Sequence, residues 1–220
     1  MKFSTISIVV VSLLLFAGRA YSQIDILKKV FEPDVFHVTQ ELRQYIEKDL
    51  PRVSHDRNEE LNHIDLIFAK GMELTEKNTS EALLAISIAV LNRTDIKPRF
   101  PLLGVIQFPL PAEDSVDAVS RINNLPRYIF SDSPQDRWGD SDKLVHFFGS
   151  AYLTYETGTK KLPDAIGNMI EKGEVAFKLD TIVDPRDVFA NRLGQKFGAA
   201  LSDGREVLPS DFLSAKFIEK

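Results

Sequence analysis

Apolar residues recur along much of the chain at the three- and four-residue spacing that places them on one face of an α-helix. Val38, Leu42 and Ile46 show this spacing clearly. The same spacing predicts helices over the second half of 23–50 and over 56–77, 81–91, 141–157, 163–172 and 185–201. The pattern therefore predicts a mainly α protein, built as a small helical domain.

Helix-breaking and capping residues separate two of these helices. Asn78, Thr79 and Ser80 interrupt the apolar pattern, and either Thr79 or Ser80 can cap the helix that follows. That helix has an alternative interpretation, because Ile86 and Ile88 also alternate with other residues in the manner of a β-strand.

Prolines are concentrated in residues 96–136, which contain six of the eleven in the chain. Proline lacks an amide donor and fixes φ, so long helices are not expected there. Apolar residues such as Phe100, Leu103 and Phe108 remain frequent in this stretch. We expect a proline-rich extended strap that lies on the helical core, with one short helix over 114–123.

The predicted organisation is one compact domain behind a cleaved leader. Its parts are a signal peptide (1–22), an N-terminal helical segment (23–95), the proline-rich strap (96–136) and a C-terminal helical motif region (137–205). The 220 residues are enough for one ordinary domain, and 44% apolar with 27% charged residues is a globular composition.

The first residues have the features of an export signal. Lys2 provides a positive charge, an apolar run follows over 6–16, and Ala20 and Ser22 are the small residues of a cleavage site before Gln23. An uncleaved anchor is the alternative, but the run is shorter than the roughly 20 apolar residues of a membrane span. We expect export to the periplasm or cell envelope, with membrane association at most peripheral after cleavage.

Composition narrows the chemistry further. The chain has no cysteine, which excludes disulfides, thiolate metal sites and a cysteine nucleophile. The formal net charge is −5, and basic residues gather in nothing larger than pairs such as Lys160–Lys161, so no nucleic-acid partner is predicted. The sequence contains neither a phosphate-binding loop nor a dinucleotide fingerprint, and no cofactor is predicted.

Two polar segments carry the candidate chemistry, and the first surrounds His146. Asp140 is a suitable N-cap for the helix predicted there. Asp142 and His146 are four residues apart and share one helical face. Gly149 and Ala151 are small, so another helix can approach closely at this point.

The second segment begins at Asp184. We expect Asp184 to cap the helix, Pro185 to take its first position, and Asp187 to be the acidic residue of a capping box. Further along the same face come Asn191, Gly194 and Gly198. The two glycines suggest close contact with another helix, in the region of Gly149 and Ala151.

Taken in order, the two segments resemble the paired motifs of the VanZ-like proteins and of a related family of predicted periplasmic lipoproteins of unknown function. The matching residues are Asp142, Lys143, His146 and Phe147, then Asp187, Asn191, Gly194 and Gly198. The resemblance covers about residues 136–200 and implies an envelope location but no established reaction. The chain departs from both families, because it lacks membrane-embedded spans and the lipidated cysteine.

The candidate site depends on how the two helices meet. A short returning helix between them would make them parallel, and His146 could then face Asp187 or Asn191. Asp142, His146, Asp187 and Asn191 are the candidate catalytic residues. Asp142 and His146 are weaker candidates for metal ligands, because a closed site needs about four. The alternative is a polar clamp between helices, which we favour because most buried polar groups are simply hydrogen-bonded partners.

The sequence therefore favours an exported, non-catalytic cell-envelope protein whose helical domain binds or supports another envelope component. One alternative is a hydrolase-like or metal-dependent enzyme that uses Asp142, His146 and Asp187. Another is the binding of an apolar ligand or lipid beneath the proline-rich strap.

Overall fold

The structure, a computed structural model, describes residues 33–50, 56–91, 99–100, 104–105, 113–157 and 184–214. The predicted signal peptide (1–22) and the predicted helix over 163–172 lie outside the described residues. The described part of the chain is mainly helical, which confirms the predicted fold class. No helix in this part is both long enough and apolar enough to cross a membrane.

The N-terminal half folds into the helices that the apolar spacing predicts. They are α2 (Pro33–Gln44), which continues into the π-helix η1 (Tyr45–Asp49), then α3 (Arg57–Leu74) and α4 (Thr79–Ala89). Val38, Leu42 and Ile46 are all buried, as their shared face requires.

The start of α4 differs from the prediction in one detail. Asn78 is the N-cap, and its side chain accepts a hydrogen bond from the backbone N–H of Glu81 at 3.3 Å. The predicted caps, Thr79 and Ser80, were wrong because both already lie in the first helical turn. Every residue from Ala82 to Ala89 is buried, so apolar residues occupy all faces of α4 and its helical period is hidden in the sequence.

The described part of the proline-rich stretch contains two very short strands and one helix. Strands β1 (Arg99–Phe100) and β2 (Gly104–Val105) pair antiparallel. Helix α5 (Ser115–Asn124), capped by Asp114, confirms the short helix predicted over 114–123. Residues 125–142 then run without regular secondary structure, but Leu125, Ile129 and Phe130 of this segment are buried in the core.

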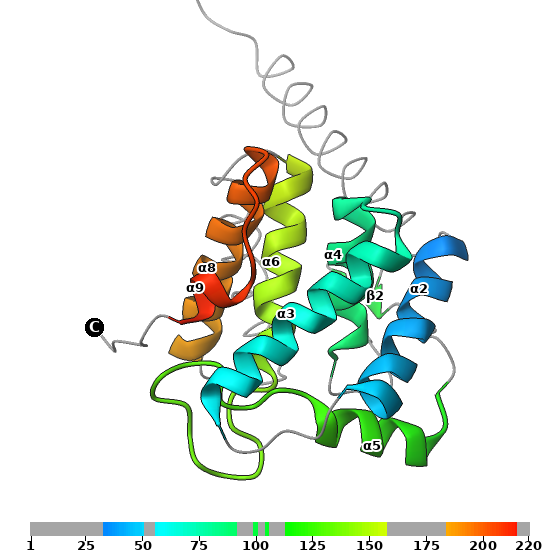
Figure 1. Cartoon of the computed structure of the whole chain (residues 1–220), viewed down its shortest axis with the longest axis vertical. Helices are drawn as coiled ribbons and strands as arrows, with labels where there is room; N and C mark the ends of the chain where they lie inside the picture. The colour runs from blue at the N-terminus through cyan, green and yellow to red at the C-terminus, as the bar shows by residue number, and fades with distance from the viewer. Residues whose placement is uncertain are drawn as a thin grey trace, which may run out of the picture.

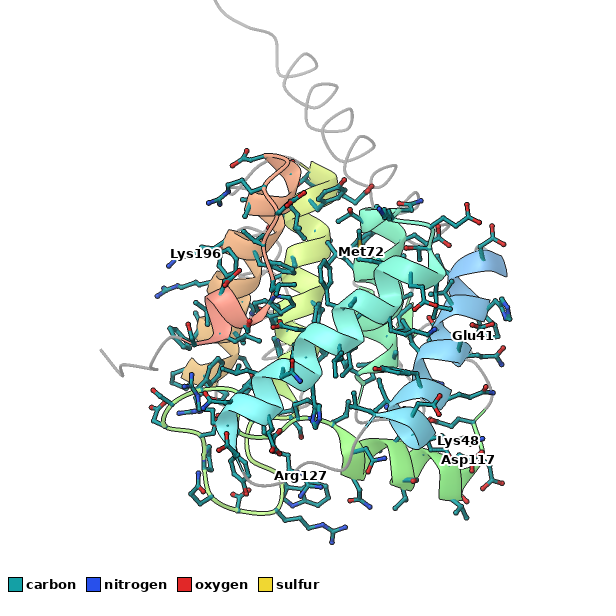
Figure 2. The ribbon with its side chains drawn as sticks, viewed as in Figure 1. Glu41, Lys48, Met72, Asp117, Arg127 and Lys196 are labelled. Carbon is teal, nitrogen blue, oxygen red and sulfur yellow. The ribbon has the colours of Figure 1, made fainter. Side chains whose placement is uncertain are left out.

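The C-terminal half is organised around α6 (Lys143–Thr157) and α8 (Pro185–Ser202), followed by the short α9 (Ser210–Leu213). Helix α6 lies between α4 and α8, and α3 crosses in front of it (Figure 1). The Phe197 ring packs on Phe147 and Phe68, with ring centroids 5.4 and 5.2 Å apart. Charged side chains such as Lys48 and Lys196 lie on the outer surface (Figure 2).

Helices α6 and α8 are in direct backbone contact, as the glycine spacing predicts, and they run parallel, as expected for helices joined by a returning segment. A β-carbon at Gly194 would overlap the carbonyl oxygen of Phe147, and one at Gly198 would overlap that of Ala151. Only glycine allows an approach this close. The predicted contact at Gly149 is wrong, because nothing lies within 4 Å of the position that its β-carbon would occupy.

Replacing Gly194 with alanine should lower the free energy of unfolding by about 2 kcal/mol, because the new methyl group forces the two backbones apart. Gly149→Ala is the matched control on the same pair of helices. It should leave stability unchanged or raise it by up to about 1 kcal/mol, because alanine is the better helix former. Urea denaturation measures both, and equal losses in the two variants would contradict the backbone contact.

Candidate functional site

A tight turn brings the chain to the start of α6. One carboxylate oxygen of Asp136 accepts hydrogen bonds from the backbone N–H groups of Trp138 and Gly139, each at 2.8 Å. Gly139 has a φ of +53°, and a β-carbon there would strike the backbone of Arg127. The N–H of Asp140 then donates to the carbonyl oxygen of Arg127 at 2.8 Å. These contacts fix the position of Asp140.

Asp140 does not cap α6, which corrects the prediction. The helix begins at Lys143, and the buried carboxylate of Asp140 instead accepts two hydrogen bonds from Arg186, at 2.8 Å from Nε and 2.5 Å from Nη2. A guanidinium that meets a carboxylate with two parallel bonds is a stronger partner than the neutral amides of a helix start. Arg186 lies on α8, so this pair joins the two helix starts.

The start of α8 follows the sequence prediction closely. The side chain of Asp184 accepts from the backbone N–H of Arg186 at 2.8 Å, and Pro185 takes the first helical position. Asp187 lies at the capping-box position, but its carboxylate faces α6. There it lies 2.7 Å from Nζ of Lys143 and 3.5 Å from Nε2 of His146.

Lys143 is the centre of the cluster. Its Nζ lies 2.6 Å from carboxylate oxygens of Asp142 and Asp184 and 2.7 Å from Asp187, while the side chain is only 6% exposed. Burial by itself lowers the pKa of Lys143, but hydrogen bonds to the three carboxylates raise the pKa well above its ordinary value. Lys143 is therefore a permanent cation.

The contact with Lys143 shifts the pKa of Asp184 downward, opposite to the shift of the Lys143 pKa. Burial by itself raises the pKa of Asp184, but the Lys143 ammonium and the backbone N–H of Arg186 hold that pKa below its ordinary value. The carboxylate thus stays charged across the neutral range. The four carboxylates at 140, 142, 184 and 187 face two cations, Lys143 and Arg186, so the cluster keeps an excess of negative charge.

The four catalytic candidates divide into two groups. Asp142 and Asp187 meet at Lys143, and His146 faces Asp187 as expected. Asn191 lies further along α8, where its side-chain oxygen accepts from the hydroxyl of Ser150 at 2.8 Å. Because α6 and α8 are parallel, contacts between them follow one another along both helices, first between His146 and Asp187 and one turn later between Ser150 and Asn191.

The structure does not bring Asp142 and His146 together as a metal pair: Asp142 is paired with Lys143, and His146 faces Asp187. Carboxylate oxygens of Asp142, Asp184 and Asp187 lie within 4.8 Å of one another, but the Lys143 ammonium lies within 2.7 Å of each of them. A divalent cation would have to displace this buried ammonium.

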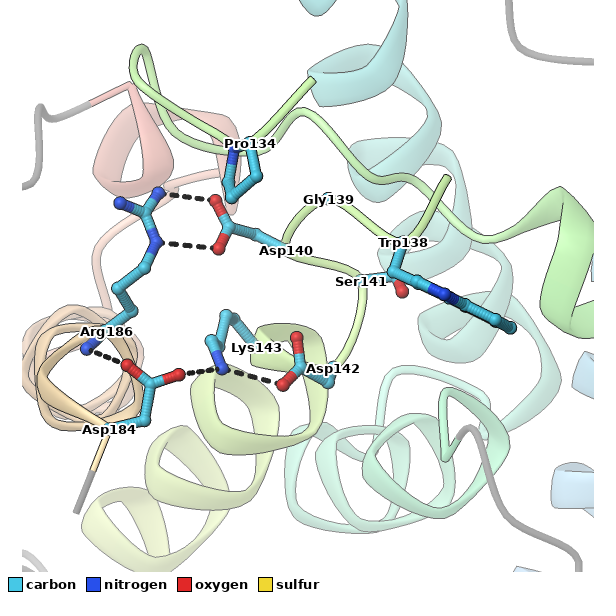
Figure 3. A pocket seen from close by; sticks show the side chains of 9 residues that line it. All are labelled: Pro134, Trp138, Gly139, Asp140, Ser141, Asp142, Lys143, Asp184 and Arg186. Carbon is cyan, nitrogen blue, oxygen red and sulfur yellow. Dashed lines mark hydrogen bonds and ion pairs between the residues drawn. The ribbon is translucent and has the colours of Figure 1, made fainter. Parts of the chain in front are cut away.

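A pocket of about 350 Å³ opens beside the cluster (Figure 3). It is lined by Pro134, Trp138, Gly139, Asp140, Ser141, Asp142, Lys143, Asp184 and Arg186. Figure 3 shows the two ion-pair groups on one wall, with Asp140 facing Arg186 and Lys143 between Asp142 and Asp184. The lining leaves out His146 and Asp187, so the pocket adjoins the candidate His–Asp pair without reaching it.

Sequence reasoning missed the roles of Lys143 and Arg186. Lys143 entered only as part of a motif, and Arg186 had no assigned role. The available signal was the excess of acidic residues at both helix starts, which needs cations nearby once the starts are buried together. Which cations these would be depended on the packing of α6 against α8.

Replacing Lys143 with methionine should lower the free energy of unfolding by about 3 kcal/mol, because three carboxylates lose their shared partner. The matched control is Lys70→Met, which removes an exposed pair with Glu73 (2.9 Å) and should cost less than about 1 kcal/mol. Urea denaturation at pH 7 measures both.

The pH dependence of the same variant provides a second check. The pKa of Asp184 is lowered in the folded state, so its pairing stabilises the fold above the ordinary value and is lost as the pH falls below it. The deficit of Lys143→Met should therefore shrink below about pH 4. A deficit that is the same at pH 3 and pH 7 would show that methionine acts through packing alone.

Comparisons of the chain with protein-family models, with curated proteins and with solved structures find no match. The VanZ-like resemblance of residues 136–200 therefore stays a prediction from two motifs.

Proposed function

We propose that this protein is an exported, non-catalytic component of the cell envelope, in which the ion cluster clamps a helical binding or supporting domain. The observation that supports it best is the position of Lys143. Its ammonium lies between three of the carboxylates that a hydrolytic or metal-dependent site would need. Carboxylates held in this way stabilise an arrangement of helices. A general base, by contrast, must be free to accept a proton from the substrate.

The envelope location is inferred from the sequence of residues 1–22 and from the two motifs. Expression of the full chain in a bacterial host should release a soluble periplasmic protein whose N-terminus is Gln23, because Ala20 and Ser22 form the cleavage site. Cell fractionation followed by intact-mass measurement checks this. An arginine in place of Ala20 is the control and should block processing. Recovery of the unprocessed wild-type chain in the membrane fraction would favour the uncleaved anchor.

One observation favours the enzyme alternative. His146 and Asp187 are 22% and 20% exposed, so both side chains are partly open to solvent beside the pocket. Nε2 of His146 lies 3.5 Å from a carboxylate oxygen of Asp187 that is itself buried and also faces Lys143. A hydrolase-like or metal-dependent reaction would use this pair as base and orienting acid. The lipid-binding alternative concerns the proline-rich strap, much of which lies outside the described residues.

Thermal unfolding of His146→Ala separates the clamp from the enzyme. Loss of a clamp residue costs about 1–3 kcal/mol, so the melting temperature should fall by about 2–12 °C, equally with chelator and with added zinc. His37→Ala is the matched control, because His37 faces Glu41 at 3.0 Å but is 72% exposed, and its melting temperature should stay unchanged.

The opposite result would support the enzyme. In that case His146→Ala melts at or above the wild-type temperature in chelator, and zinc stabilises the wild type alone. A residue kept for function at the expense of stability behaves in this way.

A further inference from the structure

Glu60 is a buried carboxylate that joins α3 to the segment after α5. Its side chain is 1% exposed, and one of its oxygens accepts a hydrogen bond from the backbone N–H of Arg127 at 2.5 Å. The carboxylate also accepts from the backbone N–H of Tyr128. Figure 2 shows Arg127 at the edge of the molecule, near the first turns of α3. Glu60 thus holds residues 127 and 128 through their backbone, whatever side chains they carry.

The held segment is the one that forms the pocket wall. The carbonyl oxygen of Arg127 accepts from the N–H of Asp140, and Gly139 packs against the Arg127 backbone with no room for a β-carbon. Pro134, Trp138 and Asp140 of this segment line the pocket, and Asp140 continues to Arg186 on α8. A chain of contacts therefore runs from Glu60 through Arg127 and Asp140 to the ion cluster.

We propose that Glu60 is a proton-controlled latch that holds residues 126–140 against α3 and thereby keeps the wall of the pocket in place. The inference does not depend on the proposed function. It requires only that the backbone of residues 127 and 128 can move away from Glu60 while Ile129 and Phe130 stay in the core. Residues 125–142 lack regular secondary structure, so few backbone hydrogen bonds oppose this local movement.

The direction of control follows from the burial of the carboxyl group. Burial raises the pKa of Glu60 to about 7, against the opposing effect of the backbone N–H groups of Arg127 and Tyr128. When the segment leaves, water hydrates the carboxyl group and its pKa returns towards the ordinary value of about 4.5. The attached state therefore binds the proton more tightly, and it loses stability as the pH rises from about 4.5 to about 7. Low pH therefore stabilises the contact between Glu60 and residues 127 and 128, and neutral or alkaline pH weakens it.

Other charged groups around Glu60 do not reproduce this titration. From the facing segment, the charge that acts on Glu60 is Arg127, which stays cationic throughout. On α3 itself, Arg57 donates to the carbonyl oxygen of Leu213, and Glu59 points to solvent. Burial lowers the pKa of His63, so its titration acts with the opposite sign, and the attached state gains stability from it as the pH rises.

Hydrogen exchange measured by NMR on the full folded chain tests the latch. After correction for the intrinsic exchange rate, the amides of Arg127 and Tyr128 should lose about 100-fold in protection between pH 5 and pH 8. At pH 8 they should exchange at least tenfold faster than the amide of Phe197 in α8. Equal protection of the three amides would overturn the proposal, because the segment would then open only when the whole protein unfolds.

Two variants and one direct titration complete the test. Glu60→Gln should abolish the pH dependence at both amides, whereas Glu59→Gln, on the same helix, should keep it. The carboxyl ¹³C shift of Glu60 in the wild type should titrate near pH 7, and this measurement stands even if Glu60→Gln does not fold. A midpoint near 4.5 would overturn the proposal, as would an unchanged pH dependence in Glu60→Gln.

Discussion

The close parallel contact of α6 and α8 is the constraint on which the rest of the structure depends. Gly194 and Gly198 let the two backbones touch, and this brings both helix starts to the same end of the pair. Helix N-termini carry partial positive charge and favour carboxylates, so acidic residues gather there. Those carboxylates would repel one another without a cation, and Lys143 provides it. The glycine contact and the ion cluster are two parts of one arrangement.

Buried polar side chains then fix the segments that lie outside the helices. Asp140 binds Arg186, 46 residues away, and Glu60 binds the backbone of Arg127, 67 residues away. A buried charge without a partner is costly, so arrangements that mispair these groups are penalised strongly. These contacts therefore act mainly by selecting one path for residues 125–142, whose buried apolar residues alone would allow several.

The same charges limit the chemistry available at the site. The carboxylates around Lys143, Asp187 included, are already paired, which favours a clamp, while the side chain of His146 remains partly exposed. The ion pairs line the pocket together with residues of the segment that Glu60 holds, whereas His146 and Asp187 lie outside the lining. The ion cluster around Lys143, the pocket and the Glu60 contact are thus connected. Each uses residues of the segment between α5 and α6 or residues at the starts of α6 and α8.

The sequence by itself determined the local structure. Apolar spacing predicts α2, α3, α6 and α8, and Asp184 with Pro185 marks the start of α8, because periodicity and capping act over about four residues. The spaced glycines on one helical face also predict the close contact, and the assumption of parallel helices places His146 opposite Asp187.

Only the tertiary structure decided which polar groups meet and which are buried. The sequence predicts Asp140 as a helix cap, but Asp140 binds Arg186. Lys143 occupies the centre of the cluster, a role that its place in the first motif does not reveal. Glu59 and Glu60 are identical neighbours in the sequence, yet one is exposed and the other buried. The physical reason is that burial and ion pairing depend on segments distant along the chain, and the free energy of a charge is set by whatever the fold packs around it.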